Sequence, residues 1–339
     1  IEGTLGVEAD AAAPGVFYVF RSSEHREAYR ARRVRRIPTS RISIAPTAAF
    51  EQNRELLEPL LRFLSERGRP PASGELEVED QIASRLGSMG RAIKLLARVS
   101  DPSSWERAAL VRQRDLLVYL ALGGFRRRPA FGALPGELRS DIKAFFGSYA
   151  EATRLGTEVL FAAGQMKAVS QECADAPVGK LTADSLYVHV SALADLPVLL
   201  RVYEGCARTL LGDVPGATLV KLRRDKPKVS YLCYPEFDDE AHPAIQETFI
   251  ADLKALRVHH VDYRTRENPP VLHRKECFVA EGYELRPKFQ ALTKAEERAS
   301  LLDDSAVIGT RDGWHKRLGE AGLEVRGHRL MKVRAALGF

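Results

Sequence analysis

The spacing of apolar residues changes from a helical to a strand-like period near Pro177, and this change constrains the fold most. Before it, segments such as AFEQNRELLEPLLRFLSERG place leucines three and four residues apart, which is the period of one helix face. After it, the segments ATLVKLR, KVSYLCY, ETFIADL and RVHHVDY alternate like strands, with turn sequences suited to hairpins between neighbours. The sequence therefore predicts a multi-domain α+β protein, mostly helical in its first half, with an antiparallel β-meander and helices in its second half.

Five regions are expected along the chain. Residues 1–20 should form a helix end and one buried strand that close an upstream domain, and the start at Ile1 rather than Met suggests a fragment. The other regions are a basic arm or linker at 21–46, a helical domain at 47–176 with a helix-turn-helix-like unit at 75–99, an α+β domain with the meander at 177–280, and C-terminal helices with a closing strand at 281–339.

Several classes of protein are excluded by motifs that the sequence lacks. The four cysteines are far apart and form no C-x-x-C pair, which argues against a zinc knuckle or a disulfide framework and predicts a reducing, cytoplasmic location. The longest uncharged apolar run, Leu116–Phe125, is too short to span a bilayer, so no membrane partner is expected. Neither common glycine-rich phosphate loop is present, so no cofactor site is expected in this chain.

The positive charge is concentrated near the N-terminus. Between Arg21 and Arg41 there are eight arginines and two glutamates, which accounts for the whole net charge of +6. Such an arm is typical of a segment that contacts phosphates, and a solvated helix face or linker is the alternative. The candidate phosphate contacts are Arg30, Arg32, Arg33, Arg35 and Arg36.

Two other basic segments predict nucleic-acid contacts. In the unit at 75–99, Arg91, Lys94 and Arg98 share one face of the second helix, as in a helix-turn-helix reader, although a helical hairpin in a bundle has the same spacing. In the meander, a basic hairpin with a nearby aromatic ring could track phosphates and stack on bases. Its candidate residues are Lys221, Arg223, Lys226, Lys228 and Tyr231.

Two clusters could carry chemistry. His273, Lys275 and Glu276 follow a rigid Asn-Pro-Pro segment and could act as acid and base on a phosphodiester, form a buried ion-pair knot, or contact nucleic acid. Asp238, Asp239 and His242 lie in an acidic turn that could hold a divalent cation or simply be solvated.

Long motifs resemble a known family. The stretch from GKLTADSLYVHV through ATLVKLRRDKPKVSYLCYPEFDDEAHP to DYRTRENPPVLHRKECFV resembles the C-terminal region of the DNA phosphorothioation-associated methyltransferases. FLSERGRPP, DLLVYLALGGFRRRP and ELRSDIKAFFGSY resemble the same family, so the likeness covers nearly the whole chain. Separately, residues 63–96 are similar to small helical repeats found beside homing endonuclease domains, except that Leu86 replaces the usual aromatic residue.

The resemblance implies a role in a bacterial modification and defence system of the restriction-modification kind. The family's S-adenosylmethionine site and catalytic core lie upstream of the segment IEGTLGVEADAAAPGVFYVFR, so no catalytic residue is carried over. The expected function is that of a DNA-recognition and accessory region, with DNA and proteins of the phosphorothioation system as partners. The alternatives are a metal-dependent nuclease or other phosphodiester-acting enzyme, and a non-enzymatic protein–protein scaffold.

Overall fold

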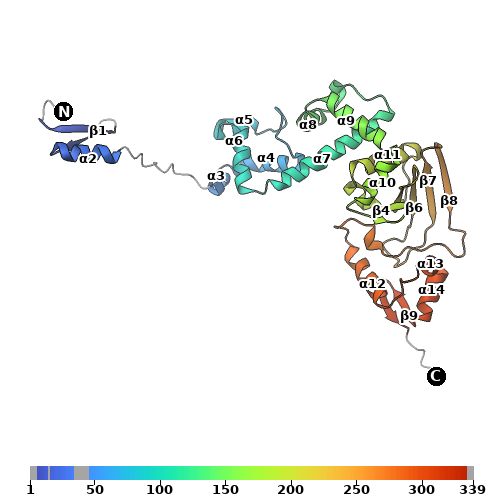
Figure 1. Ribbon diagram of the computed structural model, residues 1–339. Coiled ribbons are helices and arrows are strands. Elements are labelled where there is room, and N and C mark those ends of the chain that lie inside the picture. Colours follow the sequence, from blue (N-terminus) through green and yellow to red (C-terminus); the bar gives the residue numbers. More distant parts are fainter. Residues whose placement is uncertain (1–5, 14–15, 34–45, 334–339) are drawn as a thin grey trace.

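The computed structural model describes residues 6–13, 16–33 and 46–333, and it confirms the α+β fold class (Figure 1). A two-stranded hairpin and one helix come first, a set of helices follows, and a six-stranded sheet with a small C-terminal unit completes the chain. None of the described helices combines the length and apolar character that crossing a membrane requires.

The N-terminal unit is a hairpin of β1 (Glu8–Ala13) and β2 (Val16–Phe20) followed by helix α2 (Ser23–Arg33). The prediction of a buried strand here was wrong in its burial, because the side chains at 16–19 are each about half exposed. One short helix covers only part of a two-stranded hairpin: Tyr29 of α2 contacts the rings of Tyr18 and Phe20, and the rest of the surface stays exposed. The first part of the basic arm is helical rather than a linker, and residues 34–45, including Arg35 and Arg36, lie outside the described residues.

The helical region has the expected succession of elements. They are α3 (Pro46–Gln52), α4 (Arg54–Arg67), α5 (Glu79–Leu86), α6 (Met89–Val99), α7 (Ser103–Leu122), α8 (Gly136–Phe146), α9 (Tyr149–Ala162) and α10 (Met166–Ala174), with short 3-10 turns η1 (Gly123–Phe125) and η2 (Phe131–Ala133) before α8. The leucines of α4 are buried against Ile82 of α5 and Leu96 of α6. Helix α4 ends at Gly68, where φ is +66° and a Cβ atom would lie 2.1 Å from the backbone nitrogen of Ala109 on α7. Glycine is therefore required both by the backbone conformation and by the close approach.

A buried charge network fastens α4 to the helices that follow it. Arg69, directly after the Gly68 cap, is buried and donates to Asp141 of α8 at 2.5 Å and to Glu75 at 2.6 Å. Arg112 of α7 donates to the same Asp141 carboxylate at 2.8 Å. The GRPP sequence thus has a structural role, because its arginine links the end of α4 to α8.

The second half contains the predicted meander. Its strands run antiparallel in chain order as β3 (Lys180–Leu181), β4 (Ser185–His189), β5 (Leu219–Arg223), β6 (Lys228–Cys233), β7 (Glu247–Asp252) and β8 (Arg257–Asp262). Between β4 and β5, the 3-10 turn η3 (Val190–Asp195) leads into helix α11 (Val198–Leu211), which packs on one face of the sheet. The Tyr203 hydroxyl on α11 lies 3.1–3.3 Å from three backbone carbonyls of the β5–β6 hairpin and so holds the hairpin against the helix.

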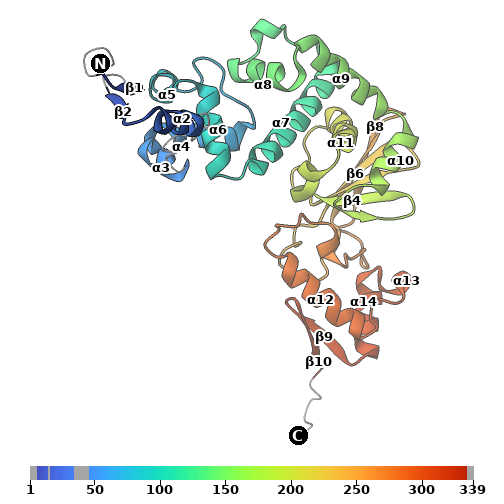
Figure 2. The ribbon, with the colours of Figure 1, turned by 60° about the vertical axis from the view of Figure 1, so that its left-hand side comes forward.

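The C-terminal unit lies below the sheet in both views (Figures 1 and 2). Its elements are η4 (Lys275–Cys277), α12 (Arg286–Arg298), α13 (Ser305–Ile308), α14 (Arg311–Glu320), β9 (Leu323–Arg326) and β10 (Arg329–Lys332). The last two strands pair as an antiparallel hairpin, where the sequence predicted one closing strand. Trp314 of α14 is buried in the small core of this unit.

Candidate functional site

Helix α6 presents a basic face to solvent. Its start is set by Gly87, with φ of +84°, and by Ser88, whose hydroxyl accepts a hydrogen bond from the Arg91 backbone N–H at 3.2 Å. The apolar side of the helix is anchored by Ala92 and Leu96, which are fully buried. This orientation leaves the predicted residues Arg91, Lys94 and Arg98 exposed on the opposite side.

The charge of this face is not compensated within the part of the chain that the structure describes. None of the three cations forms an ion pair with a described residue, and α6 itself carries no carboxylate. Helix α5 before it begins with Glu79 and Asp80. The structure therefore brings the helix-turn-helix candidates together as one surface.

The N-terminal arginines are less available. Arg30 donates to Asp10 at 2.8 and 2.9 Å and also pairs with Glu27. Asp10 also accepts a hydrogen bond from Arg26. The bond from Arg30 lowers the pKa of Asp10 most, the bond from Arg26 comes second, and the resulting pKa is about 2. Arg32 is exposed on α2, and Arg33 ends that helix. The charge of Arg30 is thus largely neutralised within its own unit.

The basic hairpin β5–β6 does not form the expected stacking platform. Tyr231 is 4% exposed and lies under α11, where its hydroxyl bonds to Glu204 at 2.8 Å, so the predicted stacking of this ring on a base was wrong. The reason is the period of the strand, because Tyr231 pairs with Val220 on the core face while Lys221 points to the other face. Lys221 lies over the Tyr187 ring at 5.0 Å.

Two of the other candidate cations of this hairpin have acidic partners. Arg223 pairs with Asp184 at 2.5 Å and with Asp225 at 2.6 Å. Lys228 pairs with Asp252 at 2.7 Å. Lys226 lies exposed in the turn between the strands. The hairpin therefore has less free positive charge than its sequence suggests.

Lys275 is buried at the junction of the sheet and the C-terminal unit. Its side chain is 3% exposed, and Nζ donates to the carbonyl oxygens of Phe237 and Glu240, both at 2.6 Å. A third hydrogen bond joins Nζ to His328 Nε2 at 3.0 Å, and the ammonium lies 3.9 Å from the centre of the Phe289 ring. Burial lowers the pKa of Lys275 to about 7. All three donors are used within the protein, which makes this lysine a connector between segments.

His273 and Glu276 are not assembled with Lys275 into an acid–base set. His273 Nε2 donates to the Ile308 carbonyl at 2.8 Å, and burial lowers the pKa of this imidazole to about 4. Glu276 accepts from the Thr293 hydroxyl on α12 at 2.9 Å. The predicted phosphodiester chemistry has no support in this geometry. The alternative of a buried ion-pair knot is met only in its burial, because the partners of Lys275 are carbonyl oxygens and an imidazole and not a carboxylate.

The three candidate residues of the acidic turn do not share one site either. Asp238 accepts from the Tyr283 hydroxyl at 2.7 Å, and Asp239 lies exposed beside it. His242 has other partners, with Nε2 bonded to Glu296 at 2.7 Å and its ring against Trp314 at 4.5 Å. Among the described residues, no group of three or more His, Cys, Asp and Glu side chains is arranged to hold a metal ion.

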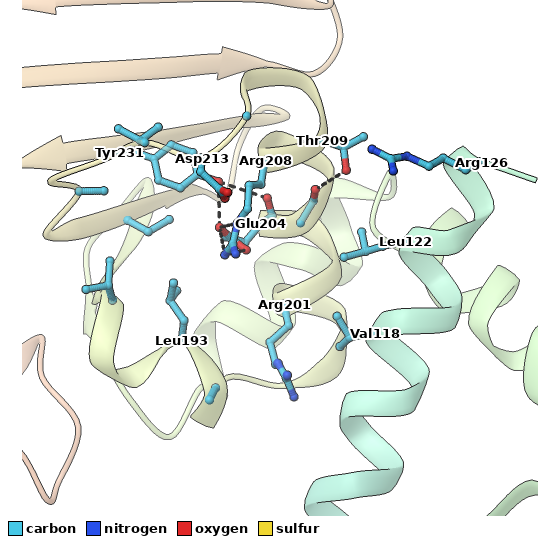
Figure 3. Close-up of a pocket in the computed structure, with 17 residues that line it drawn as sticks. Val118, Leu122, Arg126, Leu193, Arg201, Glu204, Arg208, Thr209, Asp213 and Tyr231 are labelled. Carbon is cyan, nitrogen blue, oxygen red and sulfur yellow. Dashed lines mark hydrogen bonds and ion pairs between the residues drawn. The ribbon is translucent and has the colours of Figure 1, made fainter. Parts of the chain in front are cut away.

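A pocket of about 790 Å³ lies where α7 meets α11 and the sheet, and no sequence pattern predicted it (Figure 3). Val118 and Leu122 face it from α7, Leu193 from η3 and Val220 from β5. The pocket is assembled from segments up to about a hundred positions apart in the chain, so no local motif could have revealed it.

Comparison with known proteins adds no relative, because no protein-family model, curated protein or solved structure matches the chain. The resemblance to the phosphorothioation-associated methyltransferases therefore stays a prediction from the sequence.

Proposed function

We propose that this chain is the DNA-recognition and accessory region of a methyltransferase associated with DNA phosphorothioation, and that α6 supplies its groove contact. In this proposal, S-adenosylmethionine and methyl transfer belong to a separate domain, while this region acts on DNA by binding. The observation that carries the proposal is the exposed face of Arg91, Lys94 and Arg98, which has no acidic partner among the described residues.

The dimensions of this face suit duplex DNA. Arg91 and Arg98 are seven residues apart, which is about 10 Å along a helix axis. The major groove of B-form DNA is about 12 Å wide and admits one α-helix. Arginines can bind guanine or phosphate oxygens through two N–H groups, and a lysine adds a point charge between them. Exposed Arg32 and Lys226 could add phosphate contacts at other points of the surface.

The test is the salt dependence of DNA binding. Fluorescence anisotropy with a labelled duplex, unmodified or phosphorothioated, would be measured over a series of KCl concentrations. The triple variant Arg91→Gln, Lys94→Gln, Arg98→Gln should bind more weakly, and the slope of log affinity against log salt should become shallower by about 2 to 3, at roughly 0.9 per lost phosphate contact.

The matched control changes the same number of exposed cations in the C-terminal unit. Lys294→Gln, Arg298→Gln, Lys316→Gln removes an equal charge from α12 and α14 and should leave the slope within experimental error of the unaltered protein. Equal slopes for the α6 triple and the unaltered protein would exclude α6 as the contact. No binding of either duplex at low salt would reject the DNA proposal as a whole and favour a protein–protein scaffold.

A further inference from the structure

The pocket between α7 and α11 has three arginines around an aliphatic wall. Arg201 and Arg208 lie seven residues apart on α11, and Arg126 approaches from the segment after η1 (Figure 3). Seven residues correspond to about 10 Å along the helix, so the two arginines line the pocket at different points of α11.

Two of these arginines are held in place by carboxylates. Glu204 is buried and accepts from Arg208 Nε and Nη2 at 2.7 to 3.1 Å, and the Tyr231 hydroxyl bonds to the same carboxylate at 2.8 Å. Arg201 pairs with Asp115 of α7 at 2.7 Å. The bonds between Arg208 and Glu204 use Nε and Nη2, so Nη1 stays outside that pair. A guanidinium oriented in advance loses less entropy when it binds an anion.

Two of the three arginines that line the pocket are paired with carboxylates, and the third is not. Glu204 and Asp115 each balance one arginine, whereas Arg126 forms no ion pair with any residue that the structure describes. Asp213 also borders the pocket, on the side of the α11 C-terminus.

We infer that this pocket binds a small organic anion with an apolar body, independently of any DNA contact by α6. The body would lie against Val118, Leu122 and Leu193, and the anionic group would be bound by Arg208 and Arg126. The volume of about 790 Å³ is within the usual range for small-molecule sites. Nucleotides and acyl carboxylates share this chemistry, so each is tested with its own probe.

The test is isothermal titration of the full chain with adenosine monophosphate and, separately, with decanoate. At least one probe should bind at a single site. Val190→Trp places a bulky ring on a pocket-lining position that is 40% exposed, so it should obstruct part of the pocket without disturbing the core and weaken binding by about tenfold or more. Arg126→Gln should weaken binding by about two- to fivefold, as expected for an exposed charge.

Neighbouring positions provide matched controls. Arg127→Gln removes an adjacent exposed cation that does not line the pocket, and Val111→Trp adds the same bulk on α7 at a position away from it. Both should bind the probe within about twofold of the unaltered protein. Binding of the nucleotide alone, of decanoate alone, or of both identifies the source of the anion. The inference is overturned if neither probe binds, or if Val190→Trp binds as well as Val111→Trp.

Discussion

At the scale of single residues, Asp141 shows how a charged side chain can be structural. Its carboxylate is fully buried and accepts from Arg69 and Arg112. The hydrogen bond from Arg69 is also the main reason why the pKa of Glu75 is lowered to about 2. Removing one member of such a network leaves the others charged and without a partner in the interior, which costs more than the intact network contributes.

We therefore expect Asp141→Ala to lower the free energy of unfolding by about 3 to 5 kcal/mol. The measurement is urea denaturation followed by circular dichroism. Glu158→Ala is the control, because it removes an exposed carboxylate that pairs with Arg154 on the surface of α9 and should cost about 1 kcal/mol or less. Similar losses for the two variants would show that the Asp141 network is not a structural link.

At the scale of elements, the start of α6 depends on one hydroxyl. Ser88 has an extended backbone and caps the helix through its bond to the Arg91 N–H, directly after the positive-φ Gly87. The same cap positions the basic face, since Arg91 lies in the first turn of the helix. Stability and the candidate DNA contact are thus linked at this turn.

Ser88→Ala should lower the free energy of unfolding by about 1 kcal/mol, because a free helical N–H loses its acceptor. Thermal denaturation would report the change. Ser84→Ala is the matched control, since Ser84 lies within α5 and its hydroxyl bonds only to the Gln81 carbonyl of the same helix. Alanine is the better helix former there, so this variant should be neutral or slightly stabilising. A loss as large at Ser84 as at Ser88 would contradict the capping role.

At the scale of the whole molecule, buried histidine side chains lie where the sheet meets the C-terminal unit. Burial lowers the pKa of His189, His273 and His328 to about 4, from an ordinary value of 6.5. Between these two values the unfolded chain takes up protons that the folded chain does not. The free energy of unfolding should therefore fall as the pH decreases from 6.5 to 4, by on the order of 2 kcal/mol per imidazole.

This acid sensitivity is measurable as the urea midpoint at several pH values. His328→Gln should reduce the decline between pH 6.5 and 4, because the amide oxygen can still accept from Lys275 but the side chain does not titrate. His315→Gln, at an exposed position of α14, should leave the decline unchanged. Glu75 contributes to the pH dependence only at lower pH. The stability that its ionised carboxylate provides is lost as the pH falls from about 4.5 towards 2. A flat profile above pH 4 would contradict the prediction.

Much of the fold could be predicted from the sequence because local patterns carry it. The helical spacing in 49–68, the Gly87–Ser88 turn and the four alternating segments of the meander all correspond to observed elements. The exposed side of α6 could also be predicted, since a helix with one apolar face must turn its charged face outward. The hairpin β1–β2 was missed as a pair because its first strand, EADAAA, has little strand character.

The sequence by itself thus determined the order of helices and strands and the residues that α6 presents to solvent. Only the tertiary structure decided which side chains are free to bind a partner. Arg223 and Lys228 form ion pairs with carboxylates, and Lys275 donates to backbone carbonyls in the interior. Tyr231 is buried under α11. The physical reason is the distance along the chain between the residues that decide each property. Helix and strand periods follow from neighbouring residues, whereas burial and ion pairing depend on segments distant in the chain that meet only after folding.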